Sequence, residues 1–102
     1  MKEISVKELK EKIDNKENFQ LIDVREEHEY ETVNIGAQLI PMGSIPDHLE
    51  EISKDKPVYV HCRSGARSGN ICNYLESQGF TNVYNVKGGI LAWINEIDPS
   101  LA

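Results

Sequence analysis

Apolar side chains along this chain recur at two spacings, and each spacing predicts one kind of secondary structure. Ser5 and Glu8 have the separation of a capping box, and apolar residues follow them at helical intervals. Ser44 is placed to cap a later helix, whose first turn contains Pro46. The helical pattern predicts Val6–Asn15, a short surface helix at Arg25–Tyr30, the segment after Ser44, Ala66–Gln78 and Ile90–Glu96.

Short apolar runs bounded by polar residues predict strands instead. The run Phe19–Val24 is nearly continuous, which is typical of a strand covered on both faces. Gly79 lies where a helix end needs a left-handed residue, so it separates the longest helix from the strand after it. The expected strands are a short one at Ile4 and the runs Phe19–Val24, Gln38–Pro41, Val58–His61 and Val83–Val86.

Strands and helices therefore alternate along the chain, which favours an α/β layer structure with a mainly parallel sheet. With 102 residues the chain has the length of one compact domain, so we expect residues 1–102 to form a single domain. In sheets of this kind ligands bind beyond the C-terminal ends of the strands. Cys62 and Asp23 both lie at predicted strand ends, which makes them candidate site residues.

Composition and charge narrow the possible classes of function. Apolar residues make up 39% of the chain and charged residues 27%, as in ordinary globular proteins. The net charge of -6 should repel nucleic acid and anionic membranes. No apolar run approaches the ~20 residues that cross a bilayer, so we expect no membrane partner and a cytoplasmic location. The two cysteines fit neither a disulfide framework nor a zinc-binding pattern, and no metal is expected.

The most informative stretch is Pro57–Ser68, where a predicted strand leads into a loop of small residues and then into a helix. Such a loop can turn its backbone N–H groups inward, and the helix presents its positive end to the same point. The loop holds Cys62 and two arginines, Arg63 and Arg67, on an acidic chain. Positive surroundings lower the pKa of a thiol from about 8.5, and the thiolate is the reactive form. Cys62 is therefore predicted to be a nucleophile, in preference to an inert buried cysteine.

The remainder of this loop is predicted to bind the substrate. Its small residues allow the backbone to bend sharply and to approach a ligand closely. The alternative for each arginine is a solvated surface charge. The predicted substrate-binding residues are Arg63, Ser64, Gly65, Ala66, Arg67 and Ser68.

The loop Arg63–Ser68 and the helix start after it would form a positive cradle, and an anion such as thiosulfate would fit it. The Cys62 thiolate would attack the outer, sulfane sulfur, sulfite would leave, and a persulfide would remain on the cysteine. Cyanide or another thiolate would then remove that sulfur, so we expect ping-pong kinetics. The expected partners are a small-molecule sulfur donor and acceptor, with no cofactor.

Residues near the loop are interpreted from their positions. His61 should point to the face opposite Cys62, because neighbours along a strand alternate, and we interpret it as structural. Cys72 lies on the apolar side of a helix and is interpreted as a core residue, with a resolving thiol as the alternative. Asp23 is expected to support the loop by pairing with one of its arginines. Gly88–Gly89 is expected to form a turn whose backbone borders the pocket.

Three stretches resemble the signatures of the rhodanese family of sulfurtransferases in its small single-domain form. These are Leu21–Tyr30, Val60–Ser68 and Gly79–Trp93, which occur in the expected order and at the expected spacing. The resemblance implies a five-stranded parallel sheet flanked by helices on both faces, with the persulfide on Cys62. It also implies that the backbone of Arg63–Arg67 lines the cradle.

The resemblance also bears on competing functions. Sulfurtransferases of this family have four residues between the cysteine and the arginine, and phosphatase relatives have five. Four residues separate Cys62 from Arg67 here, which argues against a phosphatase or arsenate reductase. A persulfide carrier with a protein sulfur donor or acceptor, and a partner-binding module, remain open alternatives. The chain departs from the family pattern at Thr32–Ala37, where the stretch Val33–Ala37 is one residue short, and this segment is expected to lie far from the thiol.

Overall fold

The chain builds one parallel sheet of five short strands, and the computed structural model describes residues 1–102. The strands are β1 (Lys2–Ile4), β2 (Gln20–Asp23), β3 (Gln38–Leu39), β4 (Val58–His61) and β5 (Val83–Val86). Their order across the sheet is β1-β5-β4-β2-β3, and every neighbouring pair is parallel. The predicted fold class is therefore confirmed.

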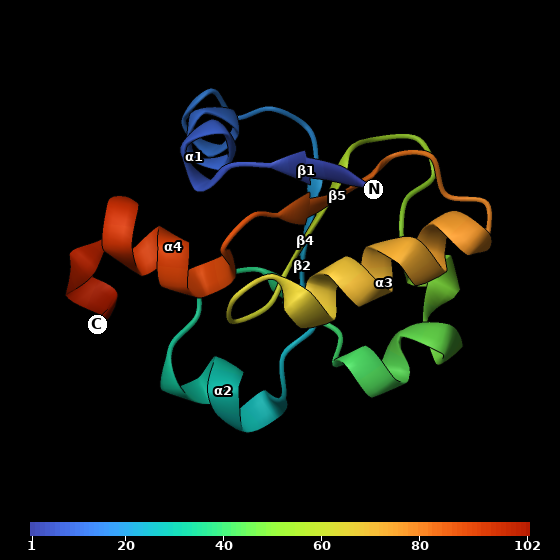
Figure 1. Ribbon diagram of the computed structural model, residues 1–102. Helices are drawn as coiled ribbons and strands as arrows, with labels where there is room; N and C mark the ends of the chain where they lie inside the picture. Colours follow the sequence, from blue (N-terminus) through green and yellow to red (C-terminus); the bar gives the residue numbers. More distant parts are fainter.

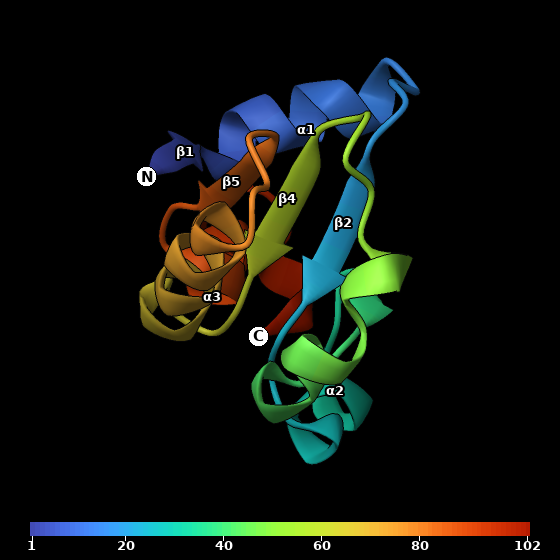
Figure 2. The same ribbon diagram turned by 90° about the vertical axis from the view of Figure 1, so that its right-hand side faces the viewer.

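Helices cover both faces of the sheet (Figure 1). The helices α1 (Val6–Asp14) and α4 (Gly89–Glu96) contact each other on one face, and α3 (Ala66–Ser77) contacts the 3-10 segment Met42–Asp47 on the other. Helix α2 (Glu27–Thr32) lies beyond the C-terminal ends of β2 and β4 (Figure 2). The loop after β4 therefore lies where α2, α3 and α4 come together.

Alternation of side chains along β4 divides the apolar core into two layers. Val58 and Val60 belong to the layer beneath α3, and Tyr59 belongs to the layer beneath α1 and α4. Because successive residues of a strand point to opposite faces, Cys62 continues the α3 side and His61 the α4 side. This register separates the thiol from the histidine, as the sequence predicted.

Two helix ends follow the sequence signals that predicted them. The Ser5 hydroxyl accepts a hydrogen bond from the backbone N–H of Glu8, and the Glu8 carboxylate accepts one from the N–H of Ser5, both at 3.1 Å. This reciprocal pair satisfies donors that the first turn of α1 would otherwise leave open. Gly79 has φ +93°, the left-handed conformation expected after α3.

The helix predicted after Ser44 is wrong in type. The segment forms two 3-10 stretches, Met42–Asp47 and Leu49–Glu51, whose backbone hydrogen bonds join residues three positions apart. Pro46 has no N–H to contribute, and the tight turns place Ile45 in the core with 0% exposure.

Element boundaries also differ from the predictions. β2 is one residue shorter at each end than Phe19–Val24, and β3 has only two residues. The short helix predicted over Arg25–Tyr30 is displaced and occupies Glu27–Thr32. Arg25 therefore lies in the turn between β2 and α2, and it is buried instead of lying on the surface.

Candidate active site

Cys62 lies directly after β4 and is almost completely buried, with 1% of its surface exposed. The next residues turn sharply, so that α3 begins at Ala66. The Cys62 Sγ atom accepts hydrogen bonds from the N–H of Gly65 at 3.1 Å, the N–H of Ser68 at 3.4 Å and the hydroxyl of Ser68 at 3.3 Å. The loop thus turns amides inward at the N-terminal end of α3, where the helix dipole is also positive.

The pKa of Cys62 reflects a balance between burial and these donors. Burial by itself raises the pKa of the thiol, because it disfavours the charged form. Hydrogen bonds from the Ser68 hydroxyl and from the amides of Ser68, Gly65 and Ser64 more than offset burial, and the pKa lies below its ordinary value. Hydrogen bonds from the cradle are therefore the leading cause of thiolate stabilisation.

Arg67 contributes less positive charge to the thiol than the sequence suggested. Its guanidinium forms a two-point ion pair with the carboxylate of Glu29 on α2, with N–O distances of 2.7 and 3.0 Å. The Arg67 hydrogen bonds are the main reason that the pKa of Glu29 falls to about 2. Arg67 therefore ties the loop to α2, and its charge is largely balanced there.

Asp23 does not pair with a loop arginine, which corrects the prediction. Its carboxylate accepts hydrogen bonds from the side chain of Arg25, the shortest at 2.8 Å, and from the Arg25 backbone N–H at 2.9 Å. Asp23 is 0% exposed and Arg25 is 2% exposed, so the two charges are buried as a pair. Arg25 also donates to the Val33 carbonyl at 2.7 Å, so this pair fixes the α2 segment beside the site.

His61 turns away from the thiol, as predicted, and points toward this buried pair. Its Nδ1 atom lies 3.2 Å from the Cys62 carbonyl oxygen, and its Nε2 atom lies 3.5 Å from Asp23 Oδ2 without forming a hydrogen bond. Burial lowers the pKa of His61, and the nearby Asp23 charge opposes this effect only in part. The ring is therefore neutral at pH 7, consistent with the structural role assigned to it.

The first turn of α4 packs against the backbone of the loop that follows Cys62. The amides of Ile90 and Leu91 donate hydrogen bonds to the carbonyl oxygens of Cys62 and Arg63, at 2.9 and 3.1 Å. Gly89 has φ +58°, and an added Cβ would lie 2.5 Å from each of those two oxygens. The glycine turn before α4 thus borders the loop as expected, and only a residue without a side chain allows so close an approach.

Arg63 is the loop arginine that stays free. It is exposed and takes part in none of the ion pairs. It lines a hollow of about 240 Å³ between α2 and α4, together with the partly exposed Leu91. Val33 lines the same hollow, so one end of the segment in which the chain departs from the family pattern borders the hollow that Arg63 also lines.

Asn85 on β5 is a site residue that the sequence did not reveal. Its side chain accepts a hydrogen bond from the Ser68 hydroxyl at 2.6 Å and donates one to the Gly65 carbonyl at 3.1 Å. A polar residue inside an apolar strand was the only sequence signal. Cys72, by contrast, is a core residue as expected, and burial raises its pKa to about 12.

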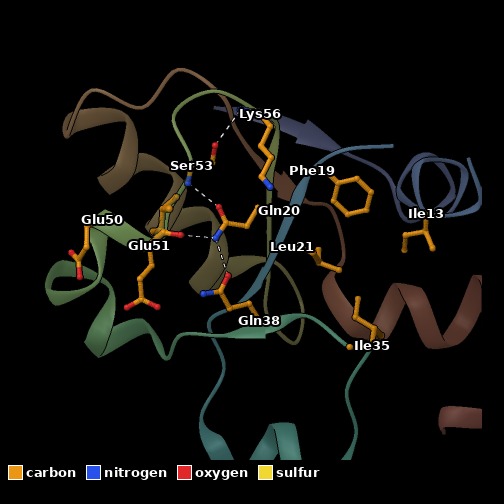
Figure 3. A pocket seen from close by; sticks show the side chains of 12 residues that line it. Ile13, Phe19, Gln20, Leu21, Ile35, Gln38, Glu50, Glu51, Ser53 and Lys56 are labelled. Carbon is orange, nitrogen blue, oxygen red and sulfur yellow. Dashed lines mark hydrogen bonds between the residues drawn. The ribbon is translucent and has the colours of Figure 1, made fainter. Parts of the chain in front are cut away.

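A larger groove, of about 750 Å³, lies at the opposite end of the sheet (Figure 3). Gln20 lies at its centre, and this side chain donates to Gln38 and to the Glu51 carbonyl and accepts from the Ser53 N–H. These contacts use the Gln20 amide to hold the segment before β4 in place. The groove adjoins the N-terminal ends of β2 and β4, so it is remote from the thiol loop in the topology.

None of the helices has both the length and the apolar character that a membrane span requires.

Comparison with known proteins identifies relatives along nearly the whole chain. The sequence model of the family described as Rhodanese-like domain matches residues 5–96. The YtwF protein of Bacillus subtilis strain 168 is 50% identical over 100 residues, which cover 97% of this chain and 96% of that protein. A protein of Allochromatium vinosum named sulfurtransferase is 40% identical over 101 residues, covering 98% of this chain and 94% of the relative.

Solved structures agree with these relatives. The crystal structure of a rhodanese-like domain protein from Staphylococcus aureus superposes with a TM-score of 0.85 and 40% sequence identity, and 91% of each chain is covered. Sequence and fold therefore point to the same family.

Proposed function

This chain belongs to the family of rhodanese-like domains, and we propose that it moves sulfane sulfur from thiosulfate to a thiophilic acceptor through a persulfide on Cys62. The observation that carries this proposal is the cradle around Sγ, in which three donors converge on one sulfur atom. Such a cradle stabilises negative charge on sulfur, which a sulfur nucleophile requires. Residues 1–102 act here as one sulfur-transfer domain.

The first half-reaction consumes the thiolate and releases sulfite. The Cys62 thiolate attacks the sulfane sulfur of thiosulfate, a new S–S bond forms, and the bond to the sulfonate sulfur breaks with its electron pair on sulfite. The product is Cys62–S–S⁻, so one negative charge stays in the cradle and no proton moves. Because the cradle favours the thiolate form of Cys62, the step starts from the ionised cysteine and needs no general base.

The second half-reaction returns the enzyme to its starting state. An acceptor thiolate or cyanide attacks the outer sulfur, the S–S bond breaks with its electron pair on Cys62, and the acceptor leaves as a persulfide or as thiocyanate. Donor and acceptor occupy the cradle in turn, which gives ping-pong kinetics.

The loop residues have distinct proposed roles. The amides of Ser64, Gly65 and Ser68 stabilise negative charge on sulfur. The small side chain of Ala66 leaves space for the ligand at the first turn of α3. Arg63 attracts the anionic donor, because it is the cation beside Cys62 that no carboxylate neutralises. Arg67 holds the loop against α2 through Glu29.

A persulfide carrier is the second candidate, and the hollow beside Arg63 favours it. Leu91 is 43% exposed at the edge of this hollow, next to the loop. The same hollow is also lined by Val33, Ile90 and Ile94. An apolar hollow beside a reactive thiol suits contact with a protein sulfur donor or acceptor. Two free cysteines also fit the proposed cytoplasmic location, where thiols stay reduced.

Mass spectrometry after thiosulfate treatment tests the proposal. We expect the mass of one added sulfur on the peptide that contains Cys62, loss of this sulfur on addition of cyanide, and no addition in Cys62→Ser. Cys72→Ala is the matched control and should still gain the sulfur. Release of phosphate from an aryl phosphate without formation of thiocyanate from thiosulfate would instead support the phosphatase alternative. Loading only by a cysteine desulfurase with its substrate would favour the carrier.

A further inference from the structure

The hydroxyl of Ser68 stands between two acceptors. Its Oγ atom lies 3.3 Å from Cys62 Sγ and 2.6 Å from Asn85 Oδ1. Ser68 is 0% exposed and Asn85 is 4% exposed, so the protein supplies their polar partners. A hydroxyl carries a single proton, and it can donate that proton to only one of the two acceptors at a time.

The orientation of Asn85 is fixed by its other contact. Its Nδ2 atom donates to the Gly65 carbonyl oxygen at 3.1 Å. A flipped amide would place Oδ1 against that carbonyl, where two acceptors would repel each other. The Asn85 oxygen therefore faces Ser68 and can only accept.

We propose that Asn85 is a positioning residue that competes with Cys62 for the hydroxyl proton of Ser68. When Cys62 is a neutral thiol, its S–H donates to Ser68 Oγ and the hydroxyl donates to Asn85. When Cys62 ionises, the hydroxyl rotates and donates to Sγ, and Asn85 Oδ1 loses its partner. The readiness with which the thiol ionises thus depends on a residue that does not touch it.

The same competition predicts that the Ser68 hydroxyl changes partner again when the persulfide forms, and this part rests on the proposed function. Formation of Cys62–S–S⁻ moves the negative charge from Sγ to the outer sulfur. The Ser68 hydroxyl then swings back to Asn85, because the bridging sulfur is a weak acceptor. Asn85 therefore stabilises the persulfide relative to the thiolate, while Ser68 stabilises the thiolate, and both half-reactions stay accessible.

The charged and titratable groups around the thiol are paired, neutral, exposed to solvent or turned away from it, so the contact between Ser68 and Cys62 is the one that can change. On the α2 side, Glu29 balances Arg67. On the β2 side, His61 faces the buried Asp23 and turns its ring away from Sγ.

The remaining ionisable neighbours come from the loop, from α3 and from the β2–α2 turn. Arg63 is exposed to solvent, and Arg25 is held by its carboxylate partner. Cys72 on α3 titrates only near its raised pKa of about 12, so it stays neutral while Cys62 ionises. The α4 turn that packs against the loop contributes backbone amides and no ionisable side chain.

A double-mutant cycle separates competition from mere support of the loop. The pKa of Cys62 is measured from the pH dependence of iodoacetamide alkylation, mapped to its peptide, in wild type, Asn85→Ala, Ser68→Ala and the double variant. Ser68→Ala should raise this pKa. With Ser68 present, Asn85→Ala should lower the pKa of Cys62. This decrease should be larger by roughly half to one unit than the change that Asn85→Ala causes in the Ser68→Ala background. Equal displacements in both backgrounds would mean that Asn85 only supports the backbone, and the proposal would fail.

A spectroscopic measurement needs no destabilising variant. The ¹³Cγ resonance of Asn85 in the wild-type protein should titrate with the pKa of Cys62, because its carbonyl loses a hydrogen bond as the thiol ionises. The titration should vanish in Ser68→Ala and in Cys62→Ser. A resonance that ignores Cys62 ionisation overturns the proposal, whatever the variants do. Asn85→Leu, which is close in shape, replaces Asn85→Ala if the latter does not fold.

These outcomes are independent of sulfur transfer. A coupled titration in a protein that never gains sulfur would leave the competition standing and remove the proposed function. Sulfur loading on Cys62 without coupling would do the reverse.

Discussion

Gly89→Ala is the substitution for which the structure makes the most specific prediction. The new Cβ would lie 2.5 Å from the carbonyl oxygens of both Cys62 and Arg63, and the backbone there has φ +58°. Ordinary carbon–oxygen contacts begin at about 3.3 Å, so α4 and the loop must separate by roughly 1 Å. Both obstructing atoms are backbone, so no side-chain rotation relieves the clash.

The magnitude follows from the contacts that this separation breaks. The amides of Ile90 and Leu91 donate to those same two carbonyls, at 2.9 and 3.1 Å, and both bonds become too long. Each is worth about 1 kcal/mol, and the left-handed backbone costs an alanine about 1–2 kcal/mol more. We expect Gly89→Ala to lower the free energy of unfolding by about 3–4 kcal/mol.

Gly36→Ala is the matched control. Gly36 has φ +81°, and an added Cβ there would meet nothing within 4 Å. This variant should lose only the backbone contribution of about 1–2 kcal/mol. Urea unfolding followed by circular dichroism measures both variants. Equal losses in the two would refute the reasoning, because the contact of α4 with the loop would then contribute nothing.

A second measurement locates the effect. Displacing the Arg63 carbonyl also rotates the peptide group that carries the Ser64 amide, which is one of the donors to Cys62. The pKa of Cys62 should therefore rise in Gly89→Ala and stay unchanged in Gly36→Ala.

Three further predictions concern charge and the second thiol. Glu29 has a pKa of about 2 in the fold against an ordinary 4.5, so its stabilising effect is complete above pH 4.5 and is lost as the pH falls toward 2. In Glu29→Gln the free energy of unfolding should therefore depend less on pH over that range. An unchanged pH dependence would contradict the ion pair. Arg67→Ala should reduce sulfur transfer at least several-fold in a thiosulfate–cyanide assay, because it releases the loop from α2, whereas Cys72→Ser should reduce it less; equal losses would mean that Cys72 has a role in transfer. Arg63→Gln should raise KM for thiosulfate about tenfold or less with little change in kcat, and the exposed Lys87→Gln serves as its control.

Much of the fold could be predicted because local pattern and local geometry agree. The capping box at Ser5, the left-handed Gly79 and the apolar run before Cys62 each act within a few residues, so their consequences are visible in the sequence. The geometry of the loop after β4 followed in the same way. A strand end, small residues and a helix start determine together that backbone amides converge on the residue between them.

The segment after Ser44 shows where local pattern fails. Its apolar spacing fits an α-helix, yet the chain forms 3-10 turns that include Pro46, with Ile45 buried. Sequence periodicity indicates which side chains are buried, but it does not distinguish an α-helix from 3-10 turns, because residues three positions apart share a face in both.

The choice of polar partners was decided only by the tertiary structure. Arg67 finds Glu29 on another helix, and Ser68 and Gly65 find Asn85 on a neighbouring strand. Asp23 and Arg25 are only two positions apart, and the structure buries their ion pair beside the turn between β2 and α2. A charged or hydroxyl side chain can satisfy itself with any complementary group in reach. The sequence therefore determined that Cys62 would lie at the start of a loop whose amides turn toward it. The packing of α2 and β5 decided which polar groups contact that loop and so affect the pKa of the thiol.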